Sequence, residues 1–240
     1  MTVTGGKSIY EASVGILMLD ARFPRIPGDM GNAATWPFPV LYRIVRGASP
    51  DLVVRHRAEG LLDAFIETGR DLIRDGAAGI TTNCGFLSLY QQELATALKV
   101  PVATSSLMQV PMVQALLPED KRVGVLTISK ASLSKDHLSA IGLPEDLPIE
   151  GTDDGQEFSR VILGDELELD VDQARTDNVN AALRLMANHP DVGAIVLECT
   201  NMGPYAADIR AATCLPVFDM VSFVTWFRAG LNPARYWPPQ

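Results

Sequence analysis

The chain has 240 residues, of which 47% are hydrophobic and 20% charged, and its formal net charge at pH 7 is -9. These values are typical of a folded globular protein and exclude a disordered one, and the negative charge disfavours a nucleic-acid partner. The first apolar run stops at Asp20, too early for a membrane span, and it lacks the basic start and the small-residue cleavage site of a signal peptide. Three cysteines form no disulfide framework, so we expect a cytoplasmic protein with free thiols and no membrane partner.

Six short runs are apolar nearly throughout, which is typical of strands buried on both faces in a parallel sheet. In chain order these predicted strands are 14–19, 77–82, 100–105, 122–127, 192–198 and 215–219. Apolar residues at helical spacing predict helices over 50–75, 86–98, 109–117, 131–141, 172–188, 204–212 and 221–229. The segment 142–169 is rich in Pro, Gly and acidic residues and is predicted to be a long connection with one short helix. This alternation predicts an α/β fold with right-handed crossovers.

The loop after the first strand, "DARFPRIPGDMGNAATWPFPV", has the length and the Pro and Gly content of a shaped functional loop. Its candidates for substrate contact are Asp20, Arg22, Arg25, Asp29 and Asn32. Either arginine could form a forked contact with a carboxylate. The alternative for each residue is an ordinary exposed position on a surface loop.

Two segments of the chain repeat each other without a gap. Cys84 lies 17 residues before Pro101, Cys199 lies 17 residues before Pro216, and a tyrosine follows each cysteine by six residues. Two copies of this length predict two pseudo-symmetric lobes, each a mainly parallel sheet flanked by helices, with a cleft between them. The predicted lobes are 1–108 plus 218–240, and 109–217.

Each cysteine of this pair follows a predicted strand, at the edge of a parallel sheet where ligands bind. Backbone N–H groups at the following helix would stabilise a thiolate, whereas burial would oppose it. Cys84 and Cys199 could therefore act on opposite faces of one carbon, one removing a proton and the other returning one. The alternative is two buried structural thiols. No cofactor is required, and no metal-ligand cluster is visible.

The motifs "TTNCGF" and "VLECTN", in two repeated α/β halves, resemble the cofactor-independent aspartate/glutamate/hydantoin racemase superfamily. The resemblance covers essentially the whole chain and implies that Cys84 and Cys199 are the acid/base pair. It also has departures: Asn201 stands where glutamate racemases have a His, and Ala21 follows Asp20 where they have a Ser. These differences argue against a standard glutamate racemase.

Residues beside the cysteines and at the end of the third predicted strand are predicted to bind substrate through backbone N–H groups or side chains, with helix capping as the alternative. They are Asn83, Gly85, Phe86, Thr104, Ser105, Thr200 and Asn201. Glu198 is expected to point away from Cys199, either as a surface acid or as a group that tunes the thiol.

The favoured function is racemisation or epimerisation at a carbon alpha to a carboxylate, on a small substrate such as aspartate, glutamate or a hydantoin. A maleate-type isomerase, a decarboxylase and a two-lobed binder without chemistry are the alternatives. Besides the small carboxylate-bearing substrate, a second copy of the chain is a possible partner, in a homo-oligomer.

Overall fold

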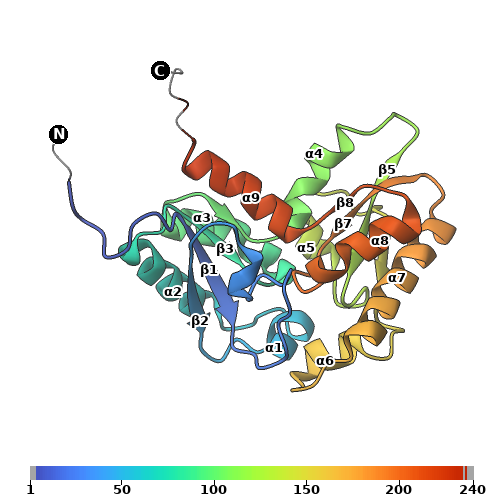
Figure 1. Cartoon of the computed structure of the whole chain (residues 1–240), viewed down its shortest axis with the longest axis horizontal. Coiled ribbons are helices and arrows are strands. Elements are labelled where there is room, and N and C mark those ends of the chain that lie inside the picture. Colours follow the sequence, from blue (N-terminus) through green and yellow to red (C-terminus); the bar gives the residue numbers. More distant parts are fainter. Residues whose placement is uncertain (1–3, 235, 237–240) are drawn as a thin grey trace.

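The computed structural model describes residues 4–234 and residue 236 of the chain. They form two α/β lobes that lie side by side, each built on a four-stranded parallel sheet flanked by helices (Figure 1). The α/β fold with two lobes is therefore confirmed.

The first sheet has the strand order β2-β1-β3-β4. Its strands are β1 (Val14–Leu19), β2 (Val40–Val45), β3 (Gly79–Thr82) and β4 (Val102–Ala103). The helical elements that follow these strands are η1 (Ala33–Thr35), α1 (Pro50–Arg55), α2 (Leu62–Asp75), η2 (Gly85–Tyr90) and α3 (Gln91–Leu98), where η denotes a 3-10 helix. Every side chain of β1 and β3 is buried, as expected for strands covered on both faces.

The second sheet repeats this order as β6-β5-β7-β8. Its strands are β5 (Arg122–Thr127), β6 (Ile149–Gly151), β7 (Val192–Leu197) and β8 (Val217–Phe218). Its helical elements are η3 (Ser106–Gln109), α4 (Val110–Gln114), α5 (Lys135–Ser139), α6 (Phe158–Gly164), α7 (Val171–Asn188), η4 (Gly203–Tyr205) and α8 (Ala206–Thr213). The repeat seen in the sequence thus corresponds to a repeated topology, with β3 and β7 in equivalent positions.

The last helix, α9 (Met220–Leu231), begins after the second sheet but packs on the first. Its buried residues Met220, Phe223 and Val224 share one apolar cluster with Val14 and Ile16 of β1. Figure 1 shows α9 lying above the first lobe, with one end at the boundary between the lobes. The chain therefore returns to its first lobe at the end.

Three local expectations were wrong. The predicted helix 50–75 is broken into α1 and α2. The residues Arg57, Ala58 and Gly60, which lie between the two helices, each have a positive φ that a right-handed helix does not allow. Strands β2 and β6 were missed. Both are edge strands, and neither is a continuous apolar run, since β2 is mostly half-buried and β6 has only three residues.

Within the described part of the chain, every helix is too short or too polar to cross a lipid bilayer.

Candidate active site

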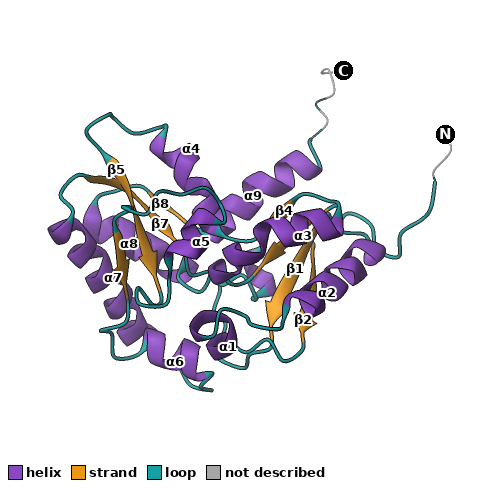
Figure 2. Ribbon diagram, turned by 180° about the vertical axis from the view of Figure 1, so that it is seen from behind, coloured by secondary structure: helices purple, strands orange, loops and turns teal. Residues whose placement is uncertain are grey.

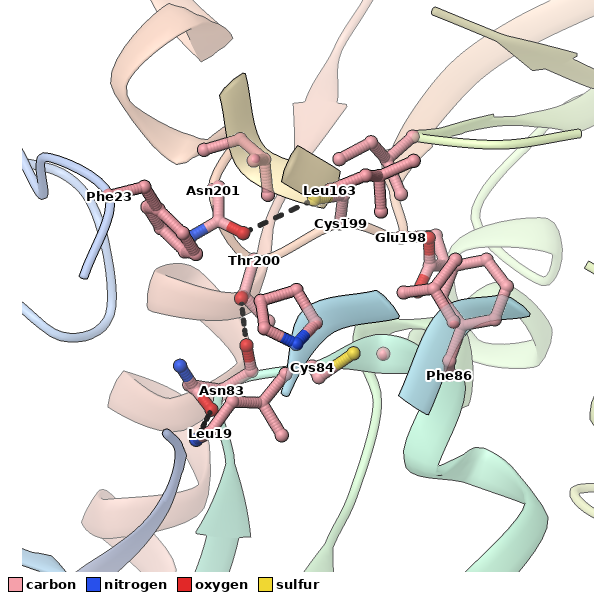
Figure 3. Close-up of a pocket in the computed structure, with 15 residues that line it drawn as sticks. Leu19, Phe23, Asn83, Cys84, Phe86, Leu163, Glu198, Cys199, Thr200 and Asn201 are labelled. Atoms are coloured by element: carbon pink, nitrogen blue, oxygen red, sulfur yellow. Dashed lines mark hydrogen bonds between the residues drawn. The ribbon is translucent and has the colours of Figure 1, made fainter. Parts of the chain in front are cut away.

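A pocket lies where the two lobes meet (Figure 3). Elements of both lobes line it, at the ends of β1, β3, β5 and β7. The lining residues are Leu19, Phe23, Pro50, Val54, Asn83, Cys84, Gly85, Phe86, Ile128, Ile162, Leu163, Glu198, Cys199, Thr200 and Asn201. The pocket is thus mainly apolar, with its polar groups concentrated on the segments 83–85 and 198–201.

Cys84 and Cys199 enter this pocket from opposite lobes. Each lies two residues beyond the end of its strand, β3 or β7, and each is free and largely buried, with 8% and 7% of its surface exposed. Both sulfur atoms face the same space in Figure 3. A ligand atom between them would have one thiol on each side.

Hydrogen bonds across the lobe boundary fix the two cysteine segments relative to each other. The Thr200 hydroxyl donates to the carbonyl of Asn83 at 2.5 Å, which joins the residue after one cysteine to the residue before the other. The Ser106 hydroxyl of the η3 turn donates to the carbonyl of Leu197 at 2.5 Å. Both bonds are buried, so the distance between the thiols is set by bonds that water does not weaken.

A chain of polar contacts holds the Cys199 thiol. Its Sγ donates to Oδ1 of Asn201 at 3.6 Å, and Nδ2 of Asn201 donates to Oδ2 of Asp29 at 2.5 Å. Nη1 of Arg25 donates to the other oxygen of Asp29 at 2.9 Å. Asp29 is only 2% exposed and belongs to the loop after β1. The long loop therefore reaches across to orient a thiol of the other lobe.

Glu198 is fully buried beside both cysteines. Its Oε2 accepts a hydrogen bond from the Thr127 hydroxyl at 2.7 Å, whereas its Oε1 has no partner among the described residues. Burial raises the pKa of this carboxyl to about 8. The sequence-based idea of a surface acid was wrong, because the chain turns after β7 and the regular alternation of the strand stops at Leu197.

Burial also raises the pKa of both thiols. The pKa of Cys84 rises to about 12 through desolvation and the nearby Glu198 charge, while the backbone N–H of Phe86 and the Arg25 guanidinium oppose the rise. The pKa of Cys199 rises well above its usual value for the same two reasons, against the backbone N–H of Asn201. Without a ligand both groups are therefore neutral thiols at neutral pH.

The structure does not bring every predicted residue to the pocket. Asp20 lies outside, paired with Arg46, and Arg22 is a largely exposed side chain that pairs with Asp165 after α6. The Thr104 hydroxyl donates to Gln91, and Ser105 caps η3. These four expectations of substrate contact find no support in the lining of the pocket.

Arg25, Asp29 and Asn32 take other positions in the same loop. The Arg25 guanidinium lies 4.3 Å from the ring centre of Phe23, a lining residue, and its Nη2 is buried without a hydrogen-bond partner among the described residues. Asn32 caps η1 and holds the carbonyl of Arg25. Of the two predicted arginines, only Arg25 lies next to the pocket.

The apolar wall was not predicted as part of the site. Pro50 and Val54 come from α1, and Ile162 and Leu163 come from α6, two helices of different lobes that pack together (Figure 2). In the sequence these residues have only the apolar spacing of ordinary core helices. No local signal distinguishes a wall that faces a ligand from one that faces the core.

No group of three or more His, Cys, Asp or Glu side chains among residues 4–234 and 236 is arranged to hold a metal ion. The third cysteine, Cys214, is exposed at the end of α8 and far from the pocket lining. It caps the helix with a φ of 57°, as Lys99 does at the equivalent position after α3.

Among curated proteins the chain is similar to several named dimethylsulfoniopropionate lyase. One from Durusdinium sp. clade D is 29% identical over 236 residues, covering 94% of this chain and 78% of that protein. Dimethylsulfoniopropionate lyase 7 of Emiliania huxleyi (strain CCMP1516) is 32% identical over 234 residues, covering 92% of this chain and 68% of that protein. No protein-family model matches the chain.

Solved structures of the racemase superfamily share its fold. An allantoin racemase from Klebsiella pneumoniae has a TM-score of 0.64 and 20% identity, with 91% of this chain and 87% of that chain covered. A glutamate racemase from Bacillus anthracis has a TM-score of 0.61 and 14% identity, with 92% and 83% covered. Unliganded arylmalonate decarboxylase has a TM-score of 0.55 and 15% identity, with 95% and 96% covered. The resemblance noted in the sequence is therefore confirmed at the level of the fold.

Proposed function

The chain belongs to the family of proteins named dimethylsulfoniopropionate lyase, and on that premise we propose that it is a lyase that cleaves dimethylsulfoniopropionate with a cysteine thiol of the pocket as the base. The sequence indicated an isomerase of the same fold. The family name favours elimination over inversion, while the chemistry at the first carbon is shared: a proton leaves the carbon next to a carboxylate.

The elimination balances without an oxidant or a reductant. A base takes a proton from C2 of the propionate, and the electron pair of that C–H bond becomes the C2–C3 double bond. The C3–S bond breaks at the same time, and its electron pair leaves with dimethyl sulfide. The products are acrylate, dimethyl sulfide and a proton held by the base.

The observation that carries the proposal is the pair of thiols facing one closed, mostly apolar pocket. A small propionate with methyl groups on its sulfur suits walls such as Val54, Ile162 and Leu163. The side-chain amide of Asn83 also lines the pocket and is available to the substrate carboxylate. Its Oδ1 accepts a hydrogen bond from the N–H of Leu19 at 2.8 Å, which fixes its orientation.

The positive charge of the substrate lowers the high pKa of the thiols. A sulfonium cation that enters the pocket offsets the negative charge of Glu198, which is one of the two causes that raise the pKa of Cys84 and Cys199. The base would thus form chiefly when the substrate is bound. Cleavage should become faster as the pH rises, because a larger fraction of the base is then thiolate.

The test is to supply dimethylsulfoniopropionate and to measure dimethyl sulfide by gas chromatography and acrylate by liquid chromatography. We expect equal amounts of both products, and a loss of about 100-fold or more in kcat for at least one of Cys84→Ser and Cys199→Ser, the one that removes the base. Cys214→Ser is the matched control, because its thiol is exposed and outside the pocket, and it should cleave like the wild type. The proposal fails if no dimethyl sulfide is released, or if both pocket variants cleave normally.

A second candidate is racemisation at a carbon next to a carboxylate, as the sequence indicated. It is favoured by the position of the thiols on opposite lobes, since elimination needs only one base. A panel of chiral amino acids and hydantoins in heavy water discriminates the two. A racemase incorporates deuterium at the alpha carbon with loss of optical rotation and releases no dimethyl sulfide.

A further inference from the structure

Glu198 is a buried acid that has no role in the proton transfer proposed for the thiols. It directly precedes Cys199, and its side chain also lies against Gly85, the residue after Cys84. A Cβ built on Gly85 would lie 2.2 Å from Oε1 of Glu198. The carboxyl group is therefore placed between the two cysteine segments, and its charge raises the pKa of both thiols.

The free oxygen of this carboxyl belongs to the pocket. Oε1 is buried and has no hydrogen-bond donor among the described residues, although Glu198 lines the pocket. No Lys, Arg or His is found among the described residues that line it. The Thr127 hydroxyl bonds Oε2, but a buried carboxylate without a cationic partner is strongly unfavourable, and a ligand could supply the missing positive charge.

The pocket also has two different sides. Figure 3 shows Glu198 and Phe86 on one side, Asn201 and Phe23 on the other, and the two cysteines between them. One face of the Phe23 ring is already covered by the Arg25 guanidinium. The Phe86 ring lies beside Glu198 in the lining and offers an aromatic surface to a cation bound there.

We propose that the Glu198 carboxylate binds the cationic end of the substrate, so that the pocket selects small carboxylates that carry an onium group. The identity of the reaction rests on the proposed function, but the preference for a cation follows from Glu198 and the lining alone. In the free protein the carboxyl holds a proton, and the bound cation takes the place of that proton.

The neighbouring charges agree with this exchange. The groups that face Glu198 are the thiols of Cys84 and Cys199, with Asp29 and Arg25 paired to each other behind them. The thiols stay neutral at pH 7, and Arg25 is already bound to Asp29. Burial raises the pKa of Glu198 to about 8, so this carboxyl group is protonated at pH 7. When a cation binds, Glu198 is therefore the group that loses its proton to the solvent.

The test uses two ligands of the same shape that differ in charge and cannot undergo the elimination readily. They are 3-(trimethylammonio)propanoate and its neutral-headed counterpart 4,4-dimethylpentanoate. We expect the wild type to bind the ammonium compound about tenfold more tightly or better. At pH 7 its binding should release close to one proton, measured by calorimetry in buffers of different ionisation enthalpy, and the neutral compound should release none.

Glu198→Gln keeps the size of the side chain and removes its charge. In this variant the preference for the ammonium compound should fall to roughly one and the proton release should disappear. Glu119→Gln, at an exposed position, removes the same charge from the surface and should bind both compounds like the wild type. If Glu198→Gln does not fold, the affinity ratio and the proton release of the wild type still decide the matter.

The proposal is overturned if the wild type binds the two compounds equally, or if Glu198→Gln keeps the preference. Tighter binding of the neutral compound would also overturn it, because a protonated Glu198 would then be a donor to the carboxylate. Cleavage of dimethylsulfoniopropionate without a charge preference refutes the role of Glu198 alone. A charge preference without cleavage refutes the proposed reaction and leaves the cation site standing.

Discussion

Gly85 allows the closest approach between the two cysteine segments. A Cβ at this position would lie 2.2 Å from the Oε1 of Glu198 and 2.4 Å from its carbonyl oxygen. A change of the Glu198 rotamer could relieve the first clash but not the second, because the carbonyl oxygen belongs to the backbone. We expect Gly85→Ala to push the segments apart, to lower the free energy of unfolding by about 1–3 kcal/mol and to reduce kcat strongly. Urea denaturation and a cleavage assay measure the two effects.

The control for this substitution is Gly230→Ala in α9, where a Cβ meets nothing within 4 Å. Because alanine favours a helix over glycine, this variant should be as stable as the wild type or more stable by up to about 1 kcal/mol. A Gly85→Ala enzyme with normal stability and rate would contradict the tight contact with Glu198.

Asn201 links the Cys199 thiol to the buried Asp29. Replacing it by Leu keeps the size but removes both contacts, so the thiol loses its orientation. We expect kcat to fall about 10- to 100-fold with a smaller change in KM, and the rate of Cys199 alkylation to change its pH dependence. The exposed Asn188→Leu is the comparison variant, and an Asn201→Leu enzyme with wild-type kcat would exclude an orienting role.

At the scale of elements, α5 of the second lobe packs against η2 of the first. The rings of His137 and Phe86 meet edge to face with their centres 5.1 Å apart, and the Ser88 hydroxyl donates to the carbonyl of His137 at 3.1 Å. Phe86 also lines the pocket. The contact between α5 and η2 therefore supports one wall of the site.

This contact makes the fold sensitive to acid. Burial, with help from the charge of Arg57, lowers the pKa of His137 from 6.5 to about 4. Between these two values the unfolded chain takes up a proton and the folded chain does not, so stability falls as the pH drops from 6.5 to 4. We expect a loss on the order of 2–3 kcal/mol, measured as the shift of the urea midpoint with pH.

The variant His137→Gln cannot take up this proton. Its free energy of unfolding should therefore fall less between pH 6.5 and 4 than that of the wild type, by the loss assigned to His137. His56→Gln changes an exposed histidine and should keep the acid dependence of the wild type. Equal slopes in the wild type and His137→Gln would mean that another group governs acid unfolding.

At the scale of the whole molecule, catalysis requires that the two lobes hold a fixed distance. The bond from the Thr200 hydroxyl to the Asn83 carbonyl joins them at the site itself. Thr200→Val keeps the shape and removes this bond, so we expect a loss of about 1–2 kcal/mol in stability and a larger relative loss in kcat. Thermal unfolding and the cleavage assay at saturating substrate measure both.

Thr225→Val serves for comparison, because it removes a hydroxyl that bonds only within α9, to the carbonyl of Val221. This variant should retain the wild-type kcat. If Thr200→Val also retains it, the bond between the lobes contributes to stability without setting the geometry of the site.

The α/β class, the repeat of two lobes and the pair Cys84 and Cys199 could be predicted from the sequence. Each depends on local information: apolar runs form buried strands, and a repeated spacing of 17 residues gives repeated topology. The break between α1 and α2 escaped prediction because apolar spacing continues across it. Edge strands such as β2 escaped because most of their side chains are only half-buried and the run is not continuously apolar.

Only the tertiary structure decided which polar groups meet in the pocket. The sequence placed Asp20 and Arg22 on the same loop as Asp29 and Arg25, and nothing local separates them. Folding carries Asp29 to Asn201, 172 positions away, and leaves Arg22 at the surface. The role of Glu198 likewise depends on the turn after β7 and on Gly85 from the other lobe, since burial and electrostatic contact between distant segments are properties of the assembled lobes.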